Sequence, residues 1–191
     1  MPPKAKFTKD EIIEAAVGIV REEGFSALTA RVLGARLGSS ARPVFTVFQG
    51  MEEVQQAVIR RAKEIYGEYV EEGLSDDIPF RGVGTQYILF SIREPKLFQL
   101  LFMKEQKKMP ELSGVLPLID DNYGKILLSI EQSYGLKGPS AERLYRHMWI
   151  YSHGIAALCA TGMCRFTGEE IKGMLAEAGK GILKNMKGEN L

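Results

Sequence analysis

The 191-residue chain has only two cysteines and two histidines, and its 25 basic and 24 acidic side chains leave a net charge of +1. Two cysteines are too few for a disulfide-rich scaffold and fit a reducing compartment. A near-neutral balance gives no general attraction to nucleic acid, so DNA binding has to be argued from particular residues. The chain is 45% hydrophobic and 26% charged, which is typical of a folded globular protein and excludes extensive disorder.

Long apolar runs are also missing. No stretch of about 18 uncharged apolar residues occurs, so we expect no transmembrane helix. The first residues, MPPKAK, lack the apolar segment of a signal peptide, and we therefore expect a cytoplasmic protein.

Strand patterns are nearly absent, whereas apolar residues recur at helical spacing along most of the chain. Thr8 and Glu11 form a capping box at the start of this pattern. Glycine and proline interrupt it at intervals, and together these features predict an all-α fold. The predicted helices cover residues 8–23, 29–37, 40–49, a longer helix from Glu52 to about Tyr69, and then 80–93, 95–105, 115–134, 140–163 and 168–187.

Residues 29–49 carry the pattern that indicates a function. Thr29 and Ser40 are each placed to cap a short amphipathic helix, and LGSS at 37–40 separates the two. Neither helix is long enough to be stable alone, but the helix predicted over 8–23 can cover their apolar faces. Three short helices with one core, the last presenting a polar face, form a helix-turn-helix DNA-binding unit. The same spacing also fits a helical hairpin whose polar face is only solvated.

The segment 40–49 presents short polar groups near its amino end, as base reading in the major groove requires. We expect Val44, Val47 and Phe48 on its inner face. The candidate DNA contacts of this segment are Ser40, Ala41, Arg42, Pro43, Thr46 and Gln49.

Four neighbouring motifs carry a resemblance, and they occur in one uninterrupted arrangement over about residues 8–60. The motifs are GFSALT at 24–29, LGARLG at 33–38, VFTVF at 44–48 and EEV at 52–54. In this combination the region resembles the N-terminal part of tetracycline-repressor (TetR) family regulators. The resemblance implies an operator-binding domain over residues 1–51, and a helical domain over 52–191 that binds a small molecule and dimerises.

The resemblance also implies roles for single residues. Thr29 would start the second helix and contact phosphate, Arg31 would lie on its solvent side, and residues 41–43 and 46 would face bases. Phe45 stands where the family usually has a phosphate-binding tyrosine, and Met51 replaces a common phosphate-binding lysine. Both departures remove a phosphate contact.

Arg42 stands where the family often has glycine, and it offers a compensating contact. An arginine can pair with O6 and N7 of guanine; a phosphate contact and a plain surface charge are the alternatives. Lys4, Lys6 and Lys9 form either a basic arm near the DNA backbone or minor groove, or a solvated tail.

The segment WIYSHGIAAL at 149–158 resembles the Trp-His-Gly (WHG) motif of one C-terminal subclass of these regulators. The helix predicted over 140–163 is apolar along two lines, so it has to be covered on two sides. The helix predicted over 168–187 has one apolar stripe and internal glycines, which suit close helix packing. We expect these two helices to form a homodimer interface of four helices, with a tightly packed monomer as the alternative.

Aromatic side chains of the C-terminal region are candidates for lining a small-molecule cavity, since such cavities have apolar walls with a few polar groups. For each of them, plain core packing is the alternative. The selected ligand-binding candidates are Phe90, Phe98, Phe102, Tyr123, Trp149 and His153, with Tyr87 and Met103 as further possibilities. His153 either contacts the ligand or is a core histidine bonded to a backbone carbonyl.

Catalytic patterns are missing. His147 and His153 are on nearly opposite sides of a helix, so they form no metal pair, and Cys159 and Cys164 lack C-x-x-C spacing. No G-x-S-x-G, H-E-x-x-H or Walker motif occurs. The adjacent pair Asp120-Asp121 is expected to be a solvated turn. We therefore expect no enzyme, no metal and no cofactor.

The sequence predicts a ligand-responsive transcriptional regulator. Its expected partners are double-stranded operator DNA, a second copy of the chain and a small-molecule effector, and the expected mode is a repressor released from its operator by that effector. The alternative is a dimeric small-molecule-binding or protein-interaction module with weak or vestigial DNA binding. Phe45 and Met51 are the residues that keep this alternative open.

Overall fold

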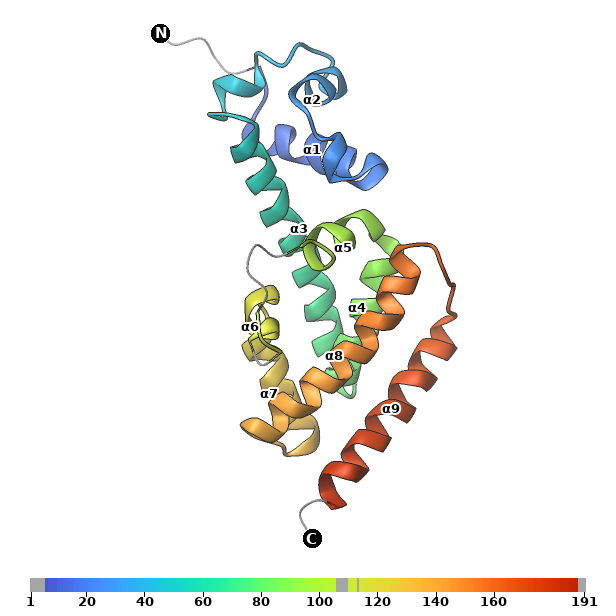
Figure 1. Cartoon of the computed structure of the whole chain (residues 1–191). Coiled ribbons are helices and arrows are strands. Elements are labelled where there is room, and N and C mark those ends of the chain that lie inside the picture. Colours follow the sequence, from blue (N-terminus) through green and yellow to red (C-terminus); the bar gives the residue numbers. More distant parts are fainter. Residues whose placement is uncertain (1–5, 106–109, 113, 189–191) are drawn as a thin grey trace. The chain divides into compact units, whose positions relative to one another are not determined.

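A computed structural model describes residues 6–105, 110–112 and 114–188, and over these ranges the chain is helical and has no strand (Figure 1). The all-α prediction is confirmed. The α-helices are α1 Lys9–Glu23, α2 Ala30–Arg36, α3 Met51–Leu74, α4 Pro79–Arg93, α5 Pro95–Phe102, α6 Val115–Ile119, α7 Tyr123–Tyr134, α8 Pro139–Ala160 and α9 Gly168–Gly188, and the 3₁₀ helices are η1 Phe25–Ala27 and η2 Val44–Thr46. No helix in the described ranges has the length and apolarity needed to cross a membrane.

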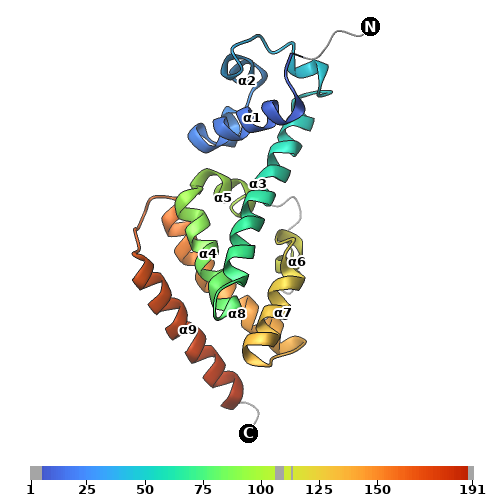
Figure 2. The same ribbon diagram turned by 180° about the vertical axis from the view of Figure 1, so that it is seen from behind.

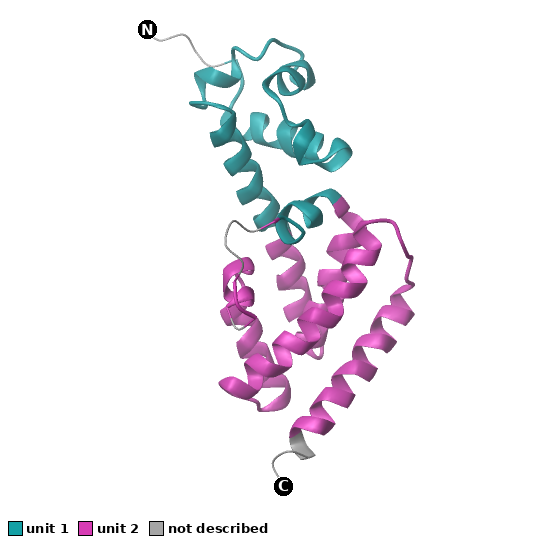
Figure 3. Ribbon diagram, viewed as in Figure 1, with its two compact units in different colours: residues 1–65, 96–104 teal, residues 66–95, 105–191 magenta. Residues whose placement is uncertain are grey.

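The chain divides into two compact units (Figure 3). The first comprises residues 1–65 and 96–104, and the second comprises residues 66–95 and 105–191. The division falls inside α3, and α5 belongs to the first unit except for its first residue, Pro95. A division into compact units does not test which residues bind DNA. The predicted boundary between a DNA-binding domain over 1–51 and a ligand-binding domain over 52–191 therefore stays a prediction.

The first unit is organised by caps and apolar spacing. Thr8 Oγ1 accepts a hydrogen bond from Glu11 N at 3.2 Å, and the Glu11 carboxylate accepts one from Thr8 N at 2.7 Å, which confirms the predicted capping box. Thr29 caps α2 in the predicted way, since its hydroxyl accepts from Val32 N at 3.3 Å. The core of this part of the chain contains Ile12, Ala16, Val20, Leu33, Val44 and Phe48, all at most 2% exposed.

The predicted α-helix over residues 40–49 is wrong, because this segment contains only the short 3₁₀ helix η2. The hydroxyl of Thr46 donates to the Pro43 carbonyl at 2.7 Å, and the same carbonyl accepts the Thr46 N–H at 3.2 Å. The Val47 N–H bonds to Val44 O at 3.1 Å, as in a 3₁₀ helix, and the Phe48 N–H bonds to the same oxygen at 3.0 Å, after which no helix continues. Val44 and Phe48 are nevertheless buried as expected.

The predicted helix over residues 115–134 is also wrong, because it is split into α6 and α7 at Asp120. Asp120 Oδ1 accepts a hydrogen bond from Asn122 N at 2.9 Å, and Asp120 O accepts one from Tyr123 N at 3.1 Å. This local bonding makes a turn in place of a helical hydrogen-bond ladder. The expected turn is present, but Asp120 is 5% exposed and therefore not solvated.

In the second unit α4 packs against α7, α8 and α9, and α8 also packs against α7 and α9. Figure 2 shows these helices from behind, with α4 and α8 neighbouring each other as in Figure 1. The loop between α3 and α4 brings their backbones together, because a Cβ atom on Gly82 would overlap the carbonyl oxygen of Gly73. The helices α3, α4, α7, α8 and α9 each contribute residues to the site described next.

Candidate functional site

The predicted DNA-binding residues lie at the surface of the first unit. Thr29, Arg31, Ser40, Arg42, Phe45, Thr46 and Gln49 are exposed, and Ala41 and Pro43 are half-buried. They belong to the beginning of α2 and to the segment around η2. Val44 and Phe48 lie between these residues in the sequence and are buried in the core. They anchor the segment, while the polar side chains beside them face solvent.

Gly34 fixes the turn against α2. A Cβ atom at this position would lie 2.7 Å from Ala41 N and 2.8 Å from Ser40 C, closer than side-chain and backbone atoms can approach. Ser39 N donates to Gly34 O at 2.9 Å and holds the same contact. The backbone from Ser39 to Ala41 therefore rests directly on α2, and this contact sets where Arg42 leaves the core.

The arginines of this region differ in their availability. Arg36 donates to both carboxylate oxygens of Glu22, at 2.9 and 2.6 Å, and this hydrogen bonding lowers the pKa of Glu22. Arg31 and Arg42 are exposed, and no ion pair holds either of them within the residues that the structure describes. These two guanidinium groups are therefore available for an external anion.

The basic residues at and before the start of α1 are partly described. Lys6 Nζ donates to Ser39 Oγ at 3.2 Å, which places this ammonium group beside the turn. Lys9 Nζ lies 3.6 Å from a Glu53 carboxylate oxygen. Lys4 lies outside the described residues.

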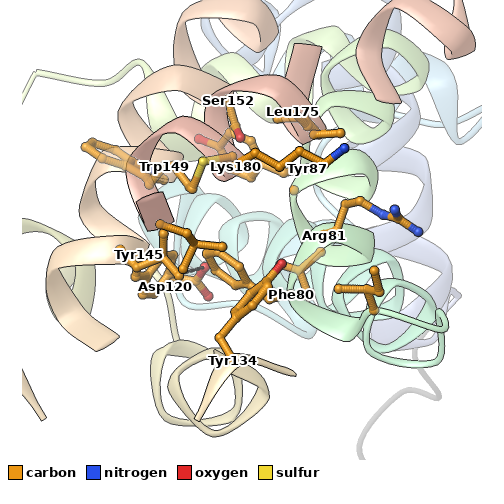
Figure 4. Close-up of a pocket in the computed structure, with 18 of the residues that line it drawn as sticks. Phe80, Arg81, Tyr87, Asp120, Tyr134, Tyr145, Trp149, Ser152, Leu175 and Lys180 are labelled. Atoms are coloured by element: carbon orange, nitrogen blue, oxygen red, sulfur yellow. Dashed lines mark hydrogen bonds between the residues drawn. The ribbon is translucent and has the colours of Figure 1, made fainter. Parts of the chain in front are cut away.

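The second unit contains a cavity of about 180 Å³ (Figure 4). Its aromatic lining residues are Tyr66, Phe80, Tyr87, Tyr134, Tyr145 and Trp149, its main aliphatic ones are Ile78, Val83, Leu144, Met148, Leu175 and Leu183, and its polar ones include Asp120, Ser152, Arg81 and Lys180. Most of the wall is carbon, with a few polar groups, which is the usual composition of a small-molecule site.

Asp120 forms the polar centre of this cavity. The hydroxyls of Tyr66 and Tyr145 donate to Asp120 Oδ2 at 2.9 and 3.2 Å, and Figure 4 shows Tyr145 beside the carboxylate. Burial raises the pKa of Asp120, and hydrogen bonds from Asn122, Tyr66 and Tyr145 oppose this shift. Burial first, and then the nearby Asp120 charge, raise the pKa values of Tyr66 and Tyr145 well above the ordinary value, so both hydroxyls stay protonated.

A second polar contact involves His153. The Tyr87 hydroxyl and His153 Nδ1 are 2.9 Å apart, and the ring centroids of Trp149 and His153 are 5.3 Å apart. Burial lowers the pKa of His153 and so favours the neutral imidazole. A neutral ring with its proton on Nε2 can accept the Tyr87 hydroxyl at Nδ1. His153 thereby orients two residues of the cavity wall.

The sequence-predicted ligand residues are only partly brought together. Trp149 lines the cavity, Tyr123 stacks on the lining residue Tyr145 with centroids 5.7 Å apart, and His153 contacts two lining residues. Phe90 is fully buried, with its ring centroid 5.4 Å from that of Tyr66. Phe98 and Phe102 contact each other in the first unit and do not line the cavity.

Sequence reasoning missed Asp120, although a signal was present. Leu116 is 4% exposed, and Asp120 follows it by one helical turn, so the spacing puts both on the inner face. It also missed the lining tyrosines at 66, 134 and 145, because they lie on three different helices and only the tertiary packing brings them together.

The fold has known counterparts, although no protein-family model and no curated protein matches the sequence. A Rhodococcus sp. RHA1 protein of unknown function matches with a TM-score of 0.66 and 14% identity over 96% of this chain and 97% of its own. The flavonoid-responsive regulator FrrA matches with a TM-score of 0.57 and 18% identity over 92% and 95%. A candidate TetR-family transcriptional regulator from Mesorhizobium loti MAFF303099 matches with a TM-score of 0.58 and 16% identity over 92% and 94%.

These similarities extend over nearly the whole of each chain, so the present chain has the TetR-type all-α fold along almost all of its length. The resemblance found in the N-terminal motifs is thereby confirmed at the level of fold. Assignment to the WHG subclass stays a prediction.

Proposed function

We propose that this chain is a sequence-specific DNA-binding transcriptional regulator of the TetR type, which acts as a homodimer and is released from its operator by a small molecule. The observation that carries the proposal is the exposure of Arg31 and Arg42, neither of which is ion-paired with a described residue, on either side of a turn that Gly34 holds against α2. The resemblance of the N-terminal motifs to TetR-family regulators supports the assignment of this surface to an operator-binding region.

The DNA contacts follow from the chemistry of the exposed groups. Arg31 offers a charge to phosphate, and Arg42 has the planar donor pair that fits a guanine edge. Phe45, at 44% exposure, offers an aromatic edge to a thymine methyl group or a sugar. The full proposed contact set is Thr29, Arg31, Ser40, Ala41, Arg42, Pro43, Phe45, Thr46 and Gln49.

The sensing step belongs to the second unit. In a dimer, each copy presents its segment 40–49 to DNA. A ligand in the cavity releases DNA only if it binds more tightly to a dimer arrangement in which these two segments have the wrong spacing for the duplex. The correct spacing is that of successive major grooves, about 34 Å. The cavity and its polar centre at Asp120 support a ligand-binding role.

The dimer is proposed to form through α8 and α9. On α8, Ile150 is 48% exposed and Tyr151 is 36% exposed, and Gly154 follows on the same side as Ile150. Exposed apolar groups of this kind, beside a glycine that permits close approach, suit a helix-to-helix contact with a second copy.

The test is selection of bound duplexes from random DNA with the full-length chain, followed by gel shift of the selected sequence at several salt concentrations. The proposal expects a palindromic consensus whose affinity falls steeply with salt. Arg42→Ala should change the preferred bases, whereas Arg60→Ala, which removes an exposed arginine from α3, should leave the consensus unchanged.

A second candidate function is a dimeric small-molecule-binding or protein-interaction module with weak or vestigial DNA binding. Phe45 and Met51 favour it, since neither side chain can bond to phosphate. A dimer that retains no duplex at low ionic strength would establish this candidate and refute the regulator.

A further inference from the structure

The Asp120 carboxylate lines the cavity, is 5% exposed, and accepts hydrogen bonds from neutral groups. Over the described ranges of the chain, no lysine, arginine or histidine forms an ion pair with it. A buried carboxylate without a counter-charge is costly, because hydroxyl and amide dipoles replace its hydration only in part. The group that would balance this charge is therefore absent from the described side chains.

Aromatic rings line the same cavity as the carboxylate. Tyr66 and Tyr145 reach it through their hydroxyls, and the ring of Phe80 lies edge-on to those of Tyr134 and Tyr145, with centroids 6.2 and 6.0 Å apart. The face of an aromatic ring carries negative potential and attracts cations. The rings and the carboxylate therefore favour the same kind of ligand group.

Neither of the two described cations of the cavity wall forms an ion pair with Asp120. Arg81 lies 3.6 Å from Asp76, and its side chain is 40% exposed, while Lys180 is exposed. Burial is the largest influence on the pKa of Asp120 and raises it, and hydrogen bonds from Asn122, Tyr66 and Tyr145 oppose this shift. Because Arg81 and Lys180 are in contact with solvent, their charges are screened, whereas that of Asp120 is not.

We infer that the cavity binds a small organic amine in its protonated form, with the ammonium group beside Asp120 and the hydrocarbon part among the aromatic rings. This inference rests on the proposed role of the second unit as a sensor. The volume of about 180 Å³ sets the size of the ligand. An apolar cavity of about 150 Å³ holds benzene, so a single ring with a short amine arm fits here.

The test uses calorimetric titration of the full-length chain with probes that share a phenyl ring and a short arm but differ in charge at pH 7. The probes are phenethylamine, which is cationic, 2-phenylethanol, which is neutral, and 3-phenylpropionate, which is anionic. We expect phenethylamine to bind at least about tenfold tighter than 2-phenylethanol, as for a hydrogen bond to a charged group. The anion should not bind.

Asp120→Asn should abolish this preference, because it removes the charge and keeps the size of the side chain. The matched control is Asp121→Asn, which makes the same charge change at the exposed neighbouring residue and should keep the preference. Circular dichroism verifies that both variants are folded. If Asp120→Asn does not fold, the comparison of the three probes on the unaltered chain still shows whether the cavity prefers the cationic one.

The outcomes separate this inference from the proposed function. Equal or tighter binding of the neutral or anionic probe would overturn the inference and leave a ligand sensor standing. Failure of all the probes to bind would overturn it too. Gel shift of the selected operator with the same preparation then decides independently whether the chain is a DNA-binding regulator.

Discussion

The backbone nitrogen of Ala41 lies 2.7 Å from the point where a Cβ atom on Gly34 would stand. At this distance the α2 backbone and the turn that follows it are in direct contact. Val44 is the first fully buried side chain after this contact. The exposed residues from Ser40 to Thr46 are therefore positioned by the Gly34–Ala41 contact and by the burial of Val44.

Gly34→Ala should therefore destabilise the first unit. The added methyl group has to displace backbone atoms and not a flexible side chain, and overpacking of this kind costs about 1–3 kcal/mol. Urea unfolding followed by circular dichroism measures the change. Gly50→Ala is the control, because among the described residues none except its chain neighbours lies within 4 Å of its Cβ position. Equal stability of the Gly34 and Gly50 variants would contradict the contact.

Phe45→Tyr should strengthen operator binding. The ring is 44% exposed, so a hydroxyl added at its tip is accessible to a phosphate oxygen. One such hydrogen bond corresponds to roughly three- to tenfold tighter binding. Fluorescence anisotropy with labelled operator measures it. Phe25→Tyr adds a hydroxyl to another ring of the same unit and should not change affinity; weaker binding of Phe45→Tyr would show that this ring makes a purely apolar contact.

Ile150→Glu should convert the proposed dimer to a monomer, because it places a charge within an apolar interface. Analytical ultracentrifugation measures the mass in solution. Leu128→Glu makes the same kind of change at an α7 residue of similar exposure, 53% against 48%, and should leave the dimer intact. Monomers in both variants, or in neither, would place the interface elsewhere.

Asp120 should make the stability of the chain depend on pH. Its pKa in the folded state is raised above the ordinary 3.8, so the folded chain binds this proton more tightly than the unfolded chain does. Stability therefore falls as pH rises from about 3.8 through the raised pKa, and is constant above it.

Urea unfolding of the unaltered chain and of Asp120→Asn over pH 4–7 isolates this contribution. The difference in unfolding free energy, unaltered chain minus variant, should decrease with rising pH and then level off. A difference that increases with pH would mean that the folded state stabilises the ionised carboxylate.

The sequence predicted the elements that depend on local signals. The capping box of Thr8 and Glu11, the Thr29 cap and the buried positions of Val44 and Phe48 all follow from short-range patterns, and the structure confirms them. Side-chain bonding to the backbone overrode the pattern at Thr46 and at Asp120, where helices were expected.

The cavity was much less predictable. Trp149, Phe98 and Phe102 are all predicted on the same ground, as aromatic side chains of the C-terminal region, but only Trp149 lines the cavity, and Phe98 and Phe102 lie in the other unit. The distance between residues such as Tyr66 and Asp120, 54 positions apart along the chain, is set by helix packing. No pattern within one helix contains that information.

The one-turn form of η2 has a thermodynamic consequence for an operator-binding protein. A segment with so few internal hydrogen bonds has little local cooperativity, and its amide protons should exchange with solvent faster than those of α1. If contact with a duplex winds this segment into a longer helix, association carries an ordering entropy and a more negative heat-capacity change than the buried area alone gives. Affinity would then depend on temperature as well as on salt.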